Sequence, residues 1–149
     1  MAEITSVKFE SSVPIKMRDG TTLLCDVFRP EAPGEFPALL ERTPYDRTSP
    51  FARSVSLDAV RACLDGYAVL VQDCRGRFGS EGEFHPFVNE INDGYDTIEW
   101  MAEQDWCDGN VGMFGGSYVG ATQWLAAISR PPHLKAITPG ITASNYHDG

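Results

Sequence analysis

Ser117 is the residue whose type and neighbours best fit covalent catalysis. It lies in the run GGSYVG at residues 115–120, directly after the apolar residues 111–114. A serine hydroxyl is a useful nucleophile only when the backbone exposes its oxygen and a base can take its proton. A tight turn from a strand into a helix meets the first requirement, because small neighbours let the turn close. The alternative is a serine that only caps the following helix.

The rest of the chain predicts the elements that would hold such a turn. Two strands, at residues 7–17 and 22–28, are predicted to form a hairpin around Asp19-Gly20. Further strands are predicted at residues 37–42, 67–72, 111–114 and 134–138. Helices are predicted at residues 55–64 and 88–104 and after Ser117. This alternation predicts a mostly parallel α/β sheet with helices on both faces, whose ligands bind where the strands end. The last strand, at residues 134–138, is expected to be an unprotected edge.

Three polar segments follow the ends of predicted strands and carry a resemblance. They are RTPYDR at 42–47, QDCRGRFGSEGEF at 72–84 and WCDGNVGMFGGSY at 106–118. In this order they resemble the CocE/NonD family of α/β-hydrolases, which includes cocaine esterases and X-prolyl dipeptidyl-peptidases of the S15 type. Val119 stands where the G-x-S-x-G pattern has its second glycine and Gly120 follows it, an offset that the family shares. The likeness runs from about residue 7 to the C-terminus and implies an incomplete α/β-hydrolase fold, without its last strands.

The resemblance implies a role for three residues. Ser117 would be the acyl-accepting nucleophile, and the backbone N–H of Tyr118 would be one oxyanion donor. The Tyr45 hydroxyl would be the other donor, because the chain has no HGGG-type segment to supply a second backbone N–H. The alternative for Tyr45 is a packed tyrosine steadied by Pro44.

A base for Ser117 is not evident in this sequence. After the serine the chain offers only His133, at the start of a strand, and His147 with Asp148 in reversed order for an α/β-hydrolase. His85 lies upstream, so chain order argues against a triad role for it. We therefore expect residues 1–149 to be the N-terminal part of an α/β-hydrolase domain, ending near the start of a helical cap, with the catalytic acid and base in further chain. We also expect no imidazole within hydrogen-bond reach of the Ser117 hydroxyl.

Other polar and aromatic residues near these segments receive structural interpretations. Asp73 and Arg75 are predicted to brace their loop, since charged groups near a sheet end are usually paired. Phe78 and Phe84 are candidates for lining a substrate pocket. Two acidic residues of the long helix, Asp96 and Glu99, are expected on a solvated face.

Composition narrows the function classes. The net charge is -9 and the basic residues are scattered, so nucleic acid is not an expected partner. No apolar run has the length of a membrane span, and the N-terminus lacks the pattern of a signal peptide. The four cysteines form no CxxC pair or zinc-ligand spacing, so we expect reduced thiols in a cytoplasmic protein and neither a metal nor a cofactor.

The sequence predicts a serine hydrolase that cleaves an acyl ester or amide of small-molecule size. An X-prolyl dipeptidyl-peptidase is the alternative within this chemistry. A hydrolase-like binding module without catalysis is the alternative of another class, because a fold does not fix a function.

Overall fold

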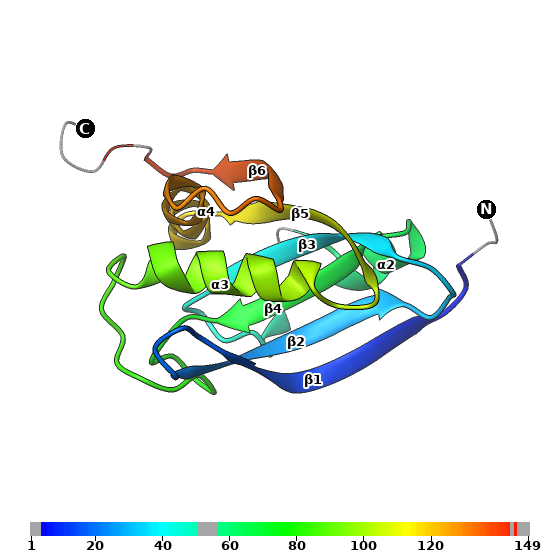
Figure 1. The fold of residues 1–149 in the computed structure, drawn as a ribbon, viewed down its shortest axis with the longest axis horizontal. Coiled ribbons are helices and arrows are strands. Elements are labelled where there is room, and N and C mark those ends of the chain that lie inside the picture. The colour runs from blue at the N-terminus through cyan, green and yellow to red at the C-terminus, as the bar shows by residue number, and fades with distance from the viewer. Residues whose placement is uncertain (1–3, 51–56, 144, 146–149) are drawn as a thin grey trace.

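A computed structural model describes residues 4–50, 57–143 and 145 of the chain, and Figure 1 shows a single twisted sheet with helices packed against it. The strands are β1 (Val7–Lys16), β2 (Thr22–Pro30), β3 (Phe36–Thr43), β4 (Ala68–Asp73), β5 (Cys107–Gly116) and β6 (Leu134–Gly140). The helices are α2 (Ala59–Leu64), α3 (Glu90–Ala102) and α4 (Tyr118–Ile128).

The six strands form one sheet in the order β1-β2-β4-β3-β5-β6. β2 is antiparallel to both of its neighbours, and the pairs β3–β4, β3–β5 and β5–β6 are parallel. The carboxyl ends of β3, β4 and β5 therefore meet at one end of the sheet, toward which the arrows of β4 and β5 point in Figure 1. This confirms the mostly parallel sheet that the alternating pattern predicted.

Apolar side chains cover the sheet on both faces. On one face, Ile98 and Met101 of α3 and Ala126 of α4 pack on the buried residues of the central strands. On the other face, Ala59 and Cys63 of α2 belong to a second buried cluster, with Val69 and Val71 of β4 among its members. β4 is buried along its whole length because helices cover both of its faces.

The element boundaries differ from the predictions mainly at the ends. α3 begins at Glu90 and not at residue 88, and β5 is longer than predicted, since it continues to Gly116. α2 begins at Ala59, and Asp58 caps it by accepting a hydrogen bond from the Arg61 N–H. Residues 55 and 56 of the predicted helix lie outside the described residues. β6 is at the edge of the sheet in the described chain, as predicted.

No helix in the described part of the chain is suited to crossing a membrane. The longest helix, α3, has 13 residues, and none of the described helices combines the length and the apolar character that a bilayer requires.

Candidate active site

The turn between β5 and α4 holds Ser117 in a strained backbone conformation. Its φ is 59° and its ψ is -126°, a region that residues with a side chain rarely occupy. Ser117 is exposed at the top of the sheet, as expected for a strand-turn-helix elbow. Ser117 occupies the N-cap position of α4, but its side chain makes no capping hydrogen bond there.

Small residues are required around this turn because β6 and the chain after it pass very close. A Cβ on Gly120 would lie 2.5 Å from Cγ2 of Thr142, and one on Gly116 would lie 3.3 Å from the Gly140 carbonyl oxygen. The Ser117 N–H donates a hydrogen bond to that same Gly140 oxygen, at 2.8 Å. The second glycine of the serine motif is thus needed at position 120, where α4 meets residues 140–142. Val119, at the position where the G-x-S-x-G pattern has that glycine, is buried.

The three residues predicted to form the site line one small cavity. Its volume is about 320 Å³, and its lining consists of Tyr45, Phe87, Ser117, Tyr118, Ile141, Thr142 and Ala143. Phe87 and Ile141 were not anticipated, since neither belongs to a polar motif. Phe78 and Phe84, which were expected in a pocket, do not line this cavity. Phe78 is 59% exposed, and Phe84 instead packs on the outer side of the Tyr118 ring, with their centroids 5.9 Å apart.

A buried arginine anchors the turn that carries Tyr45. The Arg47 guanidinium pairs with Asp73 of β4 and, at 3.1 Å, with Asp26 of β2. The backbone N–H of Arg47 also donates a hydrogen bond to Asp73, at 2.8 Å. Burial by itself lowers the pKa of Arg47, but the hydrogen bonds and charges of Asp73 and Asp26 together outweigh it and leave that pKa raised. Asp26 also holds the bulge of β1, because it accepts a hydrogen bond from the Ser12 N–H at 3.0 Å. Tyr45 itself is 46% exposed beside the cavity.

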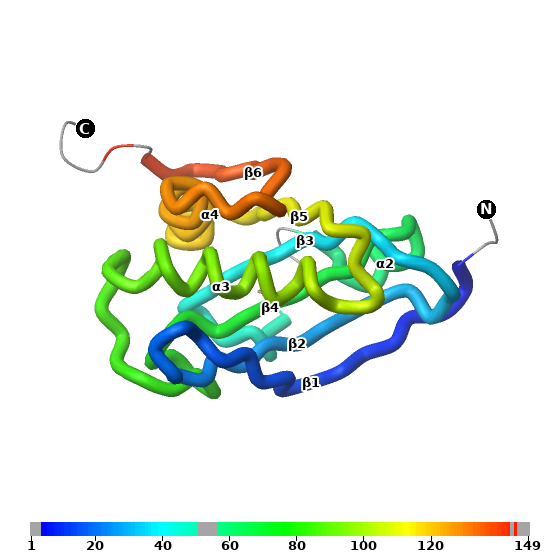
Figure 2. The backbone as a smooth tube through the Cα atoms, in the orientation of Figure 1, coloured from blue at the N-terminus to red at the C-terminus, as the bar shows by residue number. Residues whose placement is uncertain are grey.

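The long connection from β4 to α3 passes beside the cavity, and Figure 2 follows it to the start of α3 next to α4. Asp73 and Arg75 brace it, as predicted, but with partners that the sequence did not indicate. Asp73 binds Arg47, whereas Arg75 donates to Asp93 of α3 at 2.6 Å and to Asp19 of the β1–β2 turn at 2.7 Å. The hydrogen bond from Arg75 lowers the pKa of Asp19 to about 2.

The prediction that Asp96 and Glu99 of α3 lie on a solvated face is wrong. The Asp96 side chain is 13% exposed and pairs with Arg18 at 2.7 Å. The Glu99 side chain is 22% exposed and pairs with the Nδ1 atom of His133 at 2.8 Å. The β1–β2 turn and the start of β6 come back over α3, and a helix pattern alone does not show such contacts.

The histidines of the described chain do not reach Ser117. His133 is engaged with Glu99, and His85 is exposed with its Nε2 atom 3.2 Å from Glu83. Within residues 4–50, 57–143 and 145, no imidazole makes a hydrogen bond to the Ser117 hydroxyl. His147 and Asp148 lie outside the described residues. The same residues contain no group of three or more His, Cys, Asp or Glu side chains that could hold a metal ion.

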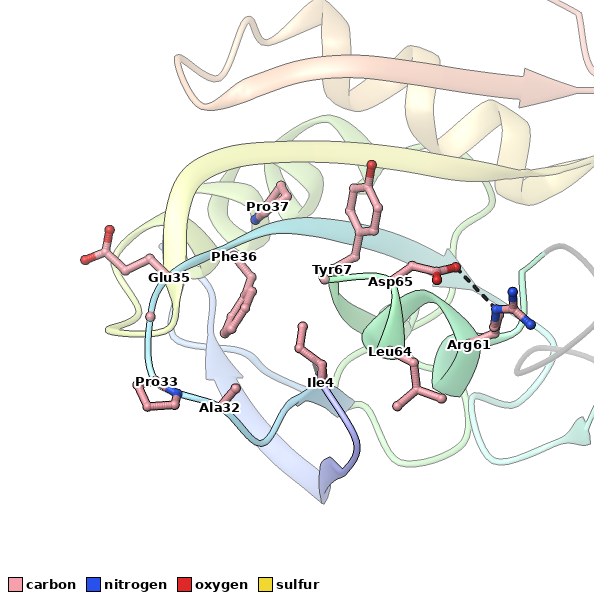
Figure 3. A pocket seen from close by; sticks show the side chains of 12 residues that line it. Ile4, Ala32, Pro33, Glu35, Phe36, Pro37, Arg61, Leu64, Asp65 and Tyr67 are labelled. Atoms are coloured by element: carbon pink, nitrogen blue, oxygen red, sulfur yellow. Dashed lines mark hydrogen bonds and ion pairs between the residues drawn. The ribbon is translucent and has the colours of Figure 1, made fainter. Parts of the chain in front are cut away.

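A larger hollow of about 980 Å³ lies at the opposite end of the sheet, where β3 and β4 begin. Figure 3 shows Ile4, Phe36, Leu64 and Tyr67 around it, with one ion pair between Arg61 and Asp65. Its described lining is mostly apolar and holds no serine, cysteine or histidine. The smaller cavity at Ser117 is therefore the candidate active site, although it is not the largest hollow.

The sheet order and the elbow define the chain as an α/β-hydrolase, and comparisons with known proteins place it more narrowly. Residues 19–149 match the X-Pro dipeptidyl-peptidase (S15) family, and the chain belongs to that family. A curated relative is cocaine esterase from Rhodococcus sp. (strain MB1 Bresler), 51% identical over 138 residues. That alignment covers 92% of this chain and 24% of the relative.

Solved structures that resemble this chain support the same family assignment. A CocE/NonD family hydrolase from Staphylococcus aureus has a TM-score of 0.81 and 32% identity, over 89% of this chain and 27% of that one. An α-amino acid ester hydrolase has a TM-score of 0.77 and 31% identity, over 92% and 26% of the two chains. The resemblance inferred from the three motifs is therefore confirmed. The chain spans between 24% and 27% of the length of these relatives.

Proposed function

We propose that residues 1–149 form the N-terminal, nucleophile-bearing part of a serine hydrolase that cleaves an acyl ester or amide through an acyl-Ser117 intermediate. The observation that carries the proposal is the strained backbone of Ser117, which aims an exposed hydroxyl into a cavity shared with Tyr45 and the start of α4. Strain of this kind costs about 1–3 kcal/mol and persists mainly where function needs the geometry.

In this proposal the Ser117 oxygen attacks the substrate carbonyl while a base takes its proton. The tetrahedral oxyanion accepts hydrogen bonds from the Tyr118 N–H, at the positive end of α4, and from the Tyr45 hydroxyl. Its collapse expels an alcohol or amine and leaves the acyl-serine, which water then hydrolyses to an acid and free Ser117. We place the base and its orienting acid in further chain, since neither His85 nor His133, the histidines of the described residues, makes a hydrogen bond to Ser117.

A serine-directed fluorophosphonate probe tests the proposal on a longer polypeptide that contains these residues. Labelling is expected in the wild type and in Ser129→Ala, and none is expected in Ser117→Ala. Ser129 is a suitable control because it lies at the other end of α4, where its hydroxyl bonds the Ala126 carbonyl. A wild-type protein that does not label supports a binding module without catalysis and contradicts the proposal.

The family match favours a second candidate within the same chemistry, an X-prolyl dipeptidyl-peptidase. Turnover of a p-nitrophenyl ester compared with that of a Xaa-Pro p-nitroanilide separates the two. A small ester or amide is the proposed substrate in either case. A cytoplasmic location is also proposed, and it is supported by four free thiols that are all buried: Cys25, Cys63, Cys74 and Cys107.

A further inference from the structure

Tyr118 has a side chain that is fixed on several sides. Its hydroxyl donates a hydrogen bond to Oε1 of Glu90 at 2.9 Å and accepts one from the Phe87 N–H at 3.0 Å. Its ring stacks on Phe87, with centroids 4.8 Å apart and planes 23° apart. Burial raises the pKa of Tyr118, and the charge of Glu90 adds to that rise, so the hydroxyl stays protonated and donates.

Glu90 is anchored in turn by a chain of buried polar groups. Its other carboxylate oxygen pairs with Nη1 of Arg42, and both side chains are almost completely buried. The Arg42 Nε donates to the Gln72 side chain at 2.7 Å, and the Thr97 hydroxyl donates to the same Gln72 oxygen at 3.0 Å. Burying an ion pair in this way costs desolvation free energy and is weak evidence for a stabilising role.

Glu90 is connected through hydrogen bonds to Tyr118 and Phe87, which both line the cavity at Ser117. Tyr118 is the first residue of α4, and its backbone N–H is the proposed oxyanion donor. Phe87 is held at a φ of 68°, which is costly for a residue with a side chain, and its N–H bond to the Tyr118 hydroxyl fixes it there.

We propose that Glu90 is a positioning residue of the acyl-transfer site, which acts through the Tyr118 hydroxyl to fix the oxyanion donor and the Phe87 wall together. The inference rests on the proposed chemistry at Ser117. Glu90 does not line the cavity, and its hydrogen bond to the Tyr118 hydroxyl joins it to a residue that does.

The test is a double-mutant cycle on the longer polypeptide with p-nitrophenyl butyrate. Tyr118→Phe removes the shared hydroxyl and leaves the Glu90–Arg42 pair intact. Glu90→Asp keeps the negative charge but shortens the side chain by one methylene, which draws the carboxylate back from the Tyr118 hydroxyl. Each variant should lower kcat/KM by about tenfold or more, mainly through kcat, because small displacements of reacting groups are costly. The double variant should lose no more than Tyr118→Phe alone.

Matched controls separate this effect from a general loss of structure. Glu99→Asp makes the same change on the same helix, at a carboxylate that pairs with His133, and Tyr67→Phe makes the same change at the far hollow. Both should retain wild-type kcat and KM. If Glu90→Asp does not fold, Glu90→Gln, which keeps the length of the side chain, replaces it in the cycle with Tyr118→Phe, and the losses should again not multiply.

Wild-type constants in Tyr118→Phe, or losses that multiply in the cycle, overturn the inference. These outcomes are distinct from a failure of the proposed function. If the proposed function is wrong, the wild-type protein is itself not labelled at Ser117 by the fluorophosphonate, whereas a labelled wild type with unaffected variants contradicts only the role of Glu90.

Discussion

The Gln123 side chain donates a hydrogen bond to the Gly115 carbonyl, at 2.9 Å, two residues before Ser117. The other end of the same amide accepts a hydrogen bond from the Thr138 N–H of β6, also at 2.9 Å. Gln123 is fully buried, whereas Gly115 is half-buried and Thr138 is exposed. One side chain of α4 thus joins the strand that leads into the elbow to the edge strand beside it.

Replacing Gln123 by leucine should lower the free energy of unfolding by about 1–2 kcal/mol, because two hydrogen bonds to the backbone are lost and the half-buried Gly115 carbonyl loses its side-chain partner. Urea unfolding measures this change. Gln104→Leu is the matched control, since Gln104 also bonds a backbone carbonyl, that of Trp100, but at the half-exposed end of α3. Equal losses in the two variants would show that Gln123 does not hold the elbow in the way described.

Tyr45→Phe tests the proposed side-chain oxyanion donor. The change removes only a hydroxyl from a 46% exposed residue, so stability should change little. If the hydroxyl stabilises the oxyanion, kcat should fall by about 10²–10³-fold, as for other donors of this kind, with a smaller effect on KM. Tyr67→Phe, at the opposite end of the sheet, is the control in the same ester assay. Wild-type kcat in Tyr45→Phe would support the interpretation of Tyr45 as a packing residue.

The sequence was sufficient for the strands, for the sheet class and for the elbow, because these depend on patterns within a few residues. The apolar run at 67–72 predicted a buried central strand, and β4 is buried on both faces. Glycine spacing around Ser117 likewise predicted a turn that the backbone angles bear out.

The partners that hold the site could not be predicted, because they come from distant parts of the chain. Arg42 was visible as a charge in an apolar strand, yet nothing in the sequence indicated that it pairs with Glu90 across 48 residues. Phe87 belongs to no motif, yet it lines the cavity and donates its N–H to the Tyr118 hydroxyl. Gln123 gave no signal in the sequence, because a position two residues along a helix from Ala121 lies on nearly the opposite side from the predicted apolar face of Ala121 and Leu125.

Arg47→Met should be among the most destabilising single changes in this chain. It leaves the buried carboxylates of Asp26 and Asp73 without their shared cation, and breaking a buried pair in this way costs about 3–5 kcal/mol. Arg61→Met is the contrasting control, because the Arg61–Asp65 pair has side chains that are 75% and 60% exposed. Its loss should stay below about 1 kcal/mol. Denaturant unfolding of both variants checks the prediction, which similar losses would contradict.

Glu41 should make the protein less stable as the pH rises. Its side chain is buried on β3, and one of its carboxylate oxygens has no hydrogen-bond partner within the described chain. Burial raises the pKa of Glu41 from 4.5 to about 8. Between these two values the folded state holds a proton that the unfolded state has released. The stabilising effect of that proton is therefore complete below pH 4.5 and is lost as the pH rises through about 8.

Glu41→Gln removes this titration, so the difference in unfolding free energy between the variant and the wild type isolates it. That difference should grow in favour of the variant by about 1.4 kcal/mol per pH unit across the interval and level off above it. Urea unfolding at a series of pH values measures the difference. Wild-type and Glu41→Gln curves that run parallel would mean that Glu41 is ionised in the folded protein, and a polar partner would then have to be found for it on this face of the sheet.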